Sequence, residues 1–80
     1  MLSSLKDQNL VVGTRRLIKA LDQGKVKTVY LAMDADLYIK KQVEEASRRN
    51  SAQIIEVSTK EELGKACGID VPTAAAGKLT

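Results

Sequence analysis

The spacing of apolar residues along the chain predicts three helices. Between Thr14 and Gly24 they recur at intervals of three and four residues, with Gly13-Thr14 as turn and N-cap and Gly24 as the end. A second helix is predicted from Leu37 to about Asn50, and a third from a capping box over residues 58–61 to Gly68 as C-cap. The residues expected to face the core are Leu17, Ile18, Ala20, Leu21, Ile39, Val43, Ala46, Leu63, Ala66 and Cys67.

Short apolar runs between these helices predict strands. Residues 28–33 form a continuous, partly β-branched run typical of a buried strand, and residues 53–57 form the next one. Residues 10–12 are a brief apolar segment that follows a short predicted helix over 3–9. The Ala-rich residues 74–78 are poor strand formers, so the last strand is expected to be weak or frayed.

This alternation predicts an α/β fold with one domain over residues 1–80. We expect a three-layer α/β/α sandwich around a small mixed, largely parallel sheet of about four strands.

Composition narrows the classes of function. The chain of 80 residues has no histidine and one cysteine, Cys67, so it lacks the commonest general base, the commonest metal ligand and any thiol–imidazole pair. We therefore expect a protein that is not an enzyme, with no catalytic residues, no metal and no cofactor. The lone cysteine, the absence of a signal-peptide pattern at the start and the lack of a long apolar run favour a cytoplasmic protein.

A basic cluster at the start of the first long helix departs from ordinary helix chemistry. Arg15, Arg16 and Lys19 share one face of its first two turns, where the positive end of the helix dipole disfavours cations, and no acidic residue offsets them in the first turn. Unpaired backbone N–H groups at the same place suit a phosphate. The cluster is either a phosphate-binding site or a solvated helix face.

The segment after Gly68 is a second candidate site. Ile69, Asp70 and Val71 put two branched apolar residues where turn residues are expected. Either Ile69 makes the hydrophobic contact that is common after a helix end and Val71 leads into the last strand, or the segment is an exposed apolar platform for an unstacked base.

Other candidate groups have simpler structural interpretations. Asp34 and Asp36 could form a metal or acid–base pair, but their place between a strand and a helix favours capping. Cys67 is interpreted as a small core residue beside Leu63, and the arginines at 48 and 49 as cations that suit a helix C-terminus.

Three segments together resemble one family. They are Gly13-Thr-Arg-Arg-Leu-Ile-Lys19, Val29-Tyr-Leu-Ala-Met-Asp34-Ala-Asp36 and Leu63-Gly-Lys-Ala-Cys-Gly-Ile-Asp-Val-Pro72. In this order and spacing the chain resembles the archaeal/eukaryotic-type ribosomal proteins that bind kink-turn RNA (the "seven-Ae" family), in their short bacterial YbxF-like form. The third segment is the most specific of the three.

The resemblance implies an α/β/α sandwich that recognises a kink-turn, a sharply bent RNA element with sheared G·A pairs and extruded bulge bases. The implied RNA-binding residues are Gly13, Thr14, Arg15, Arg16, Lys19, Asp36, Ile69, Asp70 and Val71. Well-known members carry Asn and Glu where this chain has Arg15 and Arg16, and a proline where it has Leu37. Arginine can bond G O6/N7 or phosphate, but it cannot accept a bond from a base amino group as Glu does.

We therefore expect a non-catalytic protein that recognises and stabilises kink-turn RNA, in association with a ribosome or a riboswitch. It is expected to be a monomer when free and to have no membrane partner. The alternative is a protein–protein adaptor on the same scaffold, with no specific role in RNA binding. The net charge of +3 permits an anionic partner and fits either function.

Overall fold

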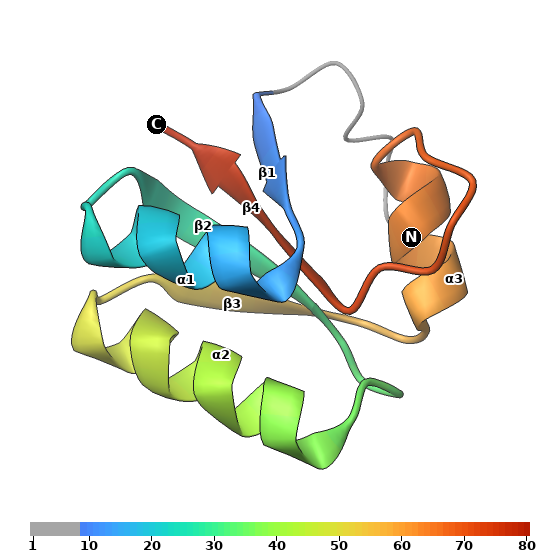
Figure 1. Cartoon of the computed structure of the whole chain (residues 1–80), viewed down its shortest axis with the longest axis horizontal. Helices are drawn as coiled ribbons and strands as arrows, with labels where there is room; N and C mark the ends of the chain where they lie inside the picture. The colour runs from blue at the N-terminus through green and yellow to red at the C-terminus, as the bar shows by residue number, and fades with distance from the viewer. Residues whose placement is uncertain (1–8) are drawn as a thin grey trace.

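Strands and helices alternate along residues 9–80, the part of the chain that this computed structural model describes (Figure 1). The elements are β1 (Leu10–Val12), α1 (Thr14–Asp22), β2 (Val26–Ala32), α2 (Leu37–Arg49), β3 (Gln53–Val57), α3 (Lys60–Ala66) and β4 (Ala75–Leu79). The helix predicted over 3–9 lies outside the described residues, apart from Asn9, which is not helical. None of the described helices is long and apolar enough to cross a lipid bilayer.

The four strands form one mixed sheet in the order β1-β4-β2-β3. The mixed four-stranded α/β fold is confirmed, but the expectation of largely parallel pairing is wrong. Only β2 and β3 run parallel, whereas β4 is antiparallel to both of its neighbours. The cause is the segment after α3, which delivers the chain to the end of β2, where the Ala32 N–H donates to the Ala74 carbonyl over 2.9 Å. From there β4 can only run back along β2.

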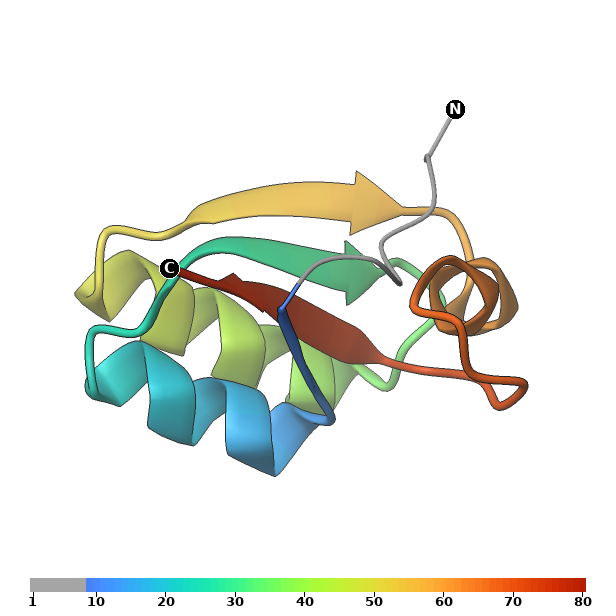
Figure 2. The ribbon, with the colours of Figure 1, turned by 90° about the horizontal axis from the view of Figure 1, so that it is seen from above.

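Side chains alternate across the sheet and build a core on each face. In β2, Val29 and Leu31 pack with α1 and α2, while Tyr30 and Ala32 pack with Leu63 of α3 on the opposite face. Figure 2 shows α1 and α2 side by side beneath the sheet, with α3 at its end. Helices therefore pack against both faces of the sheet, as the predicted three-layer arrangement requires. The core residues expected from helical spacing are all buried or packed against these two clusters.

The last strand differs most from its prediction. β4 spans five residues in the interior of the sheet, and Ala75, Ala76 and Gly77 are buried there. A Cβ on Gly77 would lie 2.5 Å from Leu17 Cδ1 and 2.9 Å from Val26 Cγ1. Small residues are therefore needed so that α1 can approach the sheet. Hydrogen bonds to two neighbouring strands hold a segment that has little strand propensity of its own.

The helix ends also shift slightly from their predicted positions. Thr59, rather than Ser58, is the N-cap of α3, and its hydroxyl accepts from the Glu62 N–H over 3.0 Å. The C-cap is Cys67, and Gly68 follows it with a φ of +81°. At α1, Gly13 is the N-cap and Thr14 is already the first helical residue.

Candidate nucleic-acid interface

α1 begins with basic residues and has no side-chain cap at its N-terminus. Gly13 has a φ of +105°, a region that favours glycine, and its N–H donates to the Ala75 carbonyl over 3.1 Å. No side chain caps this helix, and its first turn contains no acidic residue. The N-terminal N–H groups and the positive end of the dipole therefore lie beside the exposed side chains of Arg15 and Arg16.

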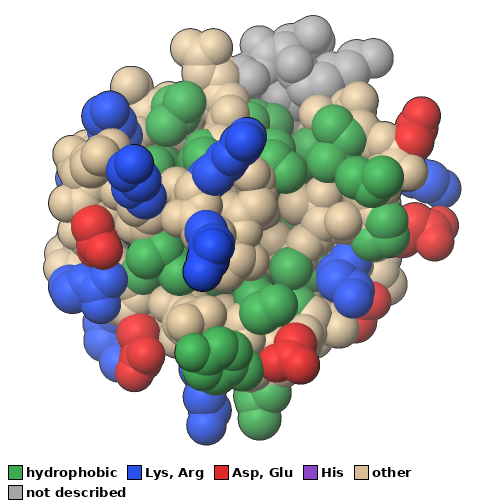
Figure 3. Space-filling model, in the orientation of Figure 1, with side chains coloured by type: hydrophobic (Ala, Val, Ile, Leu, Met, Phe, Trp, Pro, Cys, Tyr) green, Lys and Arg blue, Asp and Glu red, His purple; other side chains and the backbone are tan. Residues whose placement is uncertain are grey.

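The basic cluster extends on both sides of α1. Arg15 lines a groove between α1 and α2, Arg16 lines a hollow beside β1, and Lys19 lines both. Within residues 9–80, no carboxylate forms an ion pair with any of the three. In the view of Figure 3, Lys and Arg side chains stand over the centre of the face, where α1 lies, and acidic side chains lie mostly toward its rim. This surface is suited to an anion.

Two carboxylates in the turn between β2 and α2 accept hydrogen bonds from backbone N–H groups at the starts of helices. Asp36 is the N-cap of α2, and its Oδ1 accepts from the Tyr38 N–H over 2.8 Å. Asp34 reaches across to α3, where its Oδ1 accepts from the Lys60 N–H over 2.8 Å. Among the described residues no group of three potential metal ligands is found. The structure thus gives both carboxylates structural roles, while Asp36 also stays exposed.

The loop over residues 69–73 is fastened to α3. The Ile69 N–H donates to the Gly64 carbonyl over 3.1 Å, and the Thr73 N–H donates to the Lys60 carbonyl over 3.0 Å. Gly64 permits this approach, because a Cβ there would collide with the carbonyl oxygen of Val71. This close packing explains why a glycine stands at position 64, in the most specific of the three family-like segments.

The two apolar residues of this loop have different environments. Ile69 is half-buried and packs against the core cluster that includes Leu63 and Cys67. Val71 remains 59% exposed, and Asp70 beside it is exposed as well. Ile69 thus makes the hydrophobic contact that is common after a helix end. The Val71 side chain stays accessible for an apolar contact. Cys67 is a core residue as expected, and burial raises the pKa of its thiol.

These three segments lie at one end of the sheet. The first residue of β4 and the residue before it connect two of them, since the Ala74 carbonyl accepts from Ala32 at the end of β2 and the Ala75 carbonyl accepts from Gly13. The third segment, the 69–73 loop, leads directly into them. Figure 1 shows the start of α1, the start of α2 and the loop after α3 at this same end. All nine predicted binding residues belong to these segments.

Two exposed apolar residues at the start of α2 were not among the binding residues predicted from the sequence. Leu37 is 63% and Tyr38 is 68% exposed, and Tyr38 lines the groove between α1 and α2 together with Gln42. The sequence feature that could have identified them as exposed is helical phase. Neither residue falls on the three- and four-residue spacing of the apolar stripe at Ile39, Val43 and Ala46, so neither is expected on the buried face.

Comparison with known protein families gives a match over nearly the whole chain. The model of the "Ribosomal protein L7Ae/L30e/S12e/Gadd45 family" matches residues 2–80. An "RNA-binding protein TTE2299" from Caldanaerobacter subterraneus subsp. tengcongensis is 41% identical over 69 residues, which cover 86% of this chain and 84% of that protein. "RNA-binding protein YbxF" from Geobacillus stearothermophilus is 37% identical over 75 residues, covering 94% and 92%.

Solved structures share the fold. The Giardia lamblia 15.5kD RNA binding protein superposes with a TM-score of 0.84 at 27% identity, over 90% of this chain and 61% of that one. A protein with unknown function from Bacillus halodurans gives a TM-score of 0.83 at 25% identity, over 90% and 72%. Sequence and fold agree with the resemblance carried by the three segments. The chain belongs to the ribosomal protein L7Ae/L30e/S12e/Gadd45 family.

Proposed function

We propose that this protein is a non-catalytic RNA-binding protein that recognises kink-turn RNA. The proposal rests on side chains that lie at one end of the sheet. Arg15, Arg16 and Lys19 have no ion-pair partners among the described residues, and they lie at the same end as the exposed Val71. The names of the bacterial relatives as RNA-binding proteins support the same conclusion.

The cations at the start of α1 meet the strongly charged part of the RNA. A kinked duplex brings phosphates close together, and three cations beside a helix N-terminus offset their repulsion. The guanidinium groups of Arg15 and Arg16 also bond G O6/N7 at the sheared G·A pairs. Because arginine only donates, this chain reads acceptor atoms of the bases at these two positions.

The loop after α3 meets the bulge of the RNA. Val71 offers an exposed apolar contact to a base that has left the stack, and Ile69 anchors the loop to the core. Asp36 stands at the neighbouring helix start as an exposed acceptor for a base amino group. Binding alone is sufficient for function, since a protein that binds only the kinked form shifts the RNA population toward it.

A pair of RNAs tests this proposal. One contains the kink-turn with its sheared G·A pairs, and the other replaces these pairs with Watson–Crick pairs in the same stems. The kink-turn RNA should bind far more tightly, and changes in the distal stem sequence should have little effect. Equal affinity for both RNAs would leave a generic basic protein, and an absence of binding to either would favour the protein–protein adaptor.

The cellular RNA is a separate question with its own experiment. We propose a structured ribosomal or riboswitch RNA in the cytoplasm, bound by one copy of the chain. Crosslinking followed by sequencing of the bound RNA should recover fragments that share the kink-turn consensus. Recovered fragments without that consensus would contradict this assignment.

A further inference from the structure

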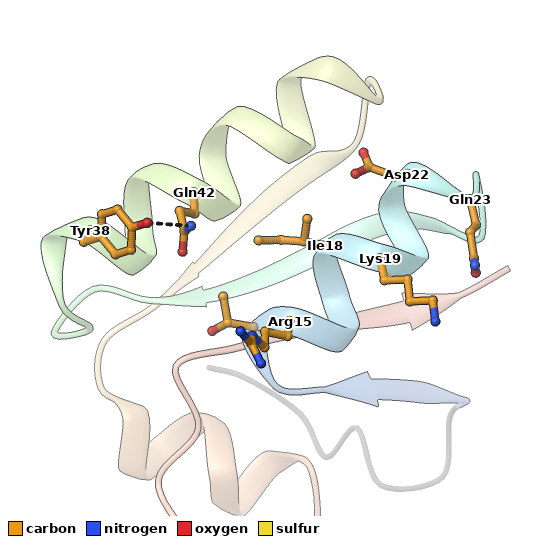
Figure 4. A pocket seen from close by; sticks show the side chains of 8 residues that line it. Arg15, Ile18, Lys19, Asp22, Gln23, Tyr38 and Gln42 are labelled. Carbon is orange, nitrogen blue, oxygen red and sulfur yellow. Dashed lines mark hydrogen bonds between the residues drawn. The ribbon is translucent and has the colours of Figure 1, made fainter.

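The groove between α1 and α2 shares Thr14, Arg15 and Lys19 with the proposed kink-turn site, but its wall on α2 takes no part in that site. Its volume is about 800 Å³, within the range of roughly 300–1,000 Å³ that is common for ligand pockets. Figure 4 shows Ile18 of α1 pointing toward α2, where Tyr38 and Gln42 lie. The groove therefore has an apolar side chain between its walls and an aromatic ring on one of them.

Tyr38 is held in place although it is exposed. The Gln42 Nε2 donates to the Tyr38 hydroxyl over 3.1 Å, one helical turn along α2 (Figure 4). Tyr38 is 68% exposed, whereas Tyr30 is only 7% exposed in the core. An oriented and exposed ring is a surface on which a planar group can stack without further loss of side-chain freedom.

Among the described residues that line the groove, the charged side chains without an ion-pair partner are positive. Asp22 also lines it, but the Asp22 carboxylate accepts from Arg49 at 2.9 and 3.1 Å and from Asn50 at 2.9 Å. The hydrogen bonds from Asn50 and Arg49 lower the pKa of Asp22, which favours its ionised form, and Arg49 compensates that charge. The remaining charges are those of Arg15 and Lys19.

We infer that this groove binds an unpaired RNA nucleotide, with its base stacked on Tyr38 and its phosphate paired with Arg15. A planar group beside an anion is the combination that the aromatic ring and the cation fit, and it is the chemistry by which single-stranded RNA is recognised. The inference rests on the proposed function, because Arg15 belongs to both surfaces. The nucleotide is therefore one that continues from the bound kink-turn RNA as a single strand.

The test compares kink-turn RNAs with and without single-stranded extensions. A blunt RNA serves as reference, and each strand end in turn carries a short adenosine extension. One of the extended RNAs should bind about five- to tenfold more tightly than the blunt RNA, the low end of what stacking on an aromatic side chain gives. The chain has two tyrosines and no tryptophan, so Tyr30→Phe leaves Tyr38 as the only fluorophore. Its emission should be quenched by the extended RNA and not by the blunt one.

Substitutions separate this groove from the kink-turn site. Tyr38→Ala should abolish the gain from the extension and leave the affinity for blunt RNA unchanged, whereas Tyr38→Phe should keep the gain. Leu37→Ala is the matched control, because Leu37 is equally exposed and adjacent but does not line the groove. It should keep the ratio between extended and blunt RNA.

The outcomes distinguish the two proposals. A gain that survives Tyr38→Ala, or no gain with any extension while blunt RNA binds, overturns the groove assignment and leaves kink-turn recognition intact. If the native protein does not bind the blunt kink-turn RNA, both proposals fall.

Discussion

Lys19 lies where the two hollows beside α1 meet, and it is exposed to solvent. Lys19→Ala should therefore change the free energy of unfolding by less than about 0.5 kcal/mol, as is usual for surface positions. It should weaken kink-turn binding by about 1–3 kcal/mol if the ammonium group reaches a base edge. Thermal melting and a binding titration measure the two effects. Lys27→Ala, an exposed lysine near the other end of β2, is the control. Undiminished RNA affinity for Lys19→Ala would remove this residue from the site.

Val71 and Ile69 make a second pair of test positions, because they differ in burial within one loop. Val71→Asp adds a carboxylate at an exposed site, so it should leave the melting temperature unchanged and weaken RNA binding through repulsion and lost apolar contact. Ile69→Asp places the same charge against the core and should lower the melting temperature sharply. If Val71→Asp melts early instead, Val71 is part of the packing and not a platform for RNA.

This pair also shows a limit of sequence reasoning at the residue scale. Both residues are branched and apolar and follow the same glycine, so residue type cannot tell which of them is buried. The hydrogen bonds of residues 69 and 73 to α3 decide it. By contrast, the basic residues at 15, 16 and 19 could be placed from the sequence, since helix phase and the dipole are local properties.

At the scale of elements, the three long amphipathic patterns predicted α1, α2 and α3, but the position and direction of β4 could not be predicted. A helix presents its apolar stripe by its own periodicity, whereas Ala75–Leu79 becomes a strand through two antiparallel neighbours that are distant in sequence. The small residues that weaken strand propensity are the ones that let α1 pack closely.

Gly77 provides the test of this interpretation. Gly77→Ala should destabilise the fold by about 1–3 kcal/mol through crowding of Leu17 and Val26, and Gly77→Val should cost more. In a domain of this size each kcal/mol lowers the melting temperature by about 4–8 °C. Lys78→Ala, at an exposed position of the same strand, should have little effect. A Gly77→Val protein as stable as the native one would show that this close approach is unimportant.

Asp22 joins α1 to Arg49 and Asn50 at the end of α2, and this contact makes one part of the stability dependent on pH. The bonds from Asn50 and Arg49 lower the pKa of Asp22 from its usual 3.8. A lowered pKa stabilises the folded state above the usual value, and this stabilisation is lost as the pH falls through the folded value. Asp22→Asn should therefore lower the melting temperature at neutral pH, and the difference from the native protein should vanish in strong acid.

Arg49→Ala checks the assignment of this effect, because it removes the charged partner and keeps the carboxylate. It should reproduce part of the loss of stability at neutral pH, because the hydrogen bond from Asn50 remains, and this part should also disappear in acid. A constant difference between Asp22→Asn and the native protein across the acid range would contradict the contact as its source.

On the scale of the whole molecule, segments from three parts of the chain form one surface because β4 runs antiparallel to β2. The strand begins beside the end of β2, where Ala74 and Ala75 accept hydrogen bonds from Ala32 and Gly13. A parallel β4 would place the 69–73 loop at the opposite end of the sheet, away from the start of α1. The sequence therefore identifies the individual segments directly. That they form one site could be inferred only through the family resemblance.

This grouping predicts how salt acts on binding. If Arg15, Arg16 and Lys19 each neutralise one phosphate, the slope of log K against log salt concentration should be about −2.1 to −2.7. The affinity for kink-turn RNA should then fall about 20- to 40-fold between 50 and 200 mM salt. Alanine at any one of the three positions should reduce the slope by roughly one unit. Arg48→Ala, an exposed arginine in the last turn of α2, should leave the slope unchanged. An affinity that is constant over this salt range would exclude phosphate neutralisation as the basis of recognition.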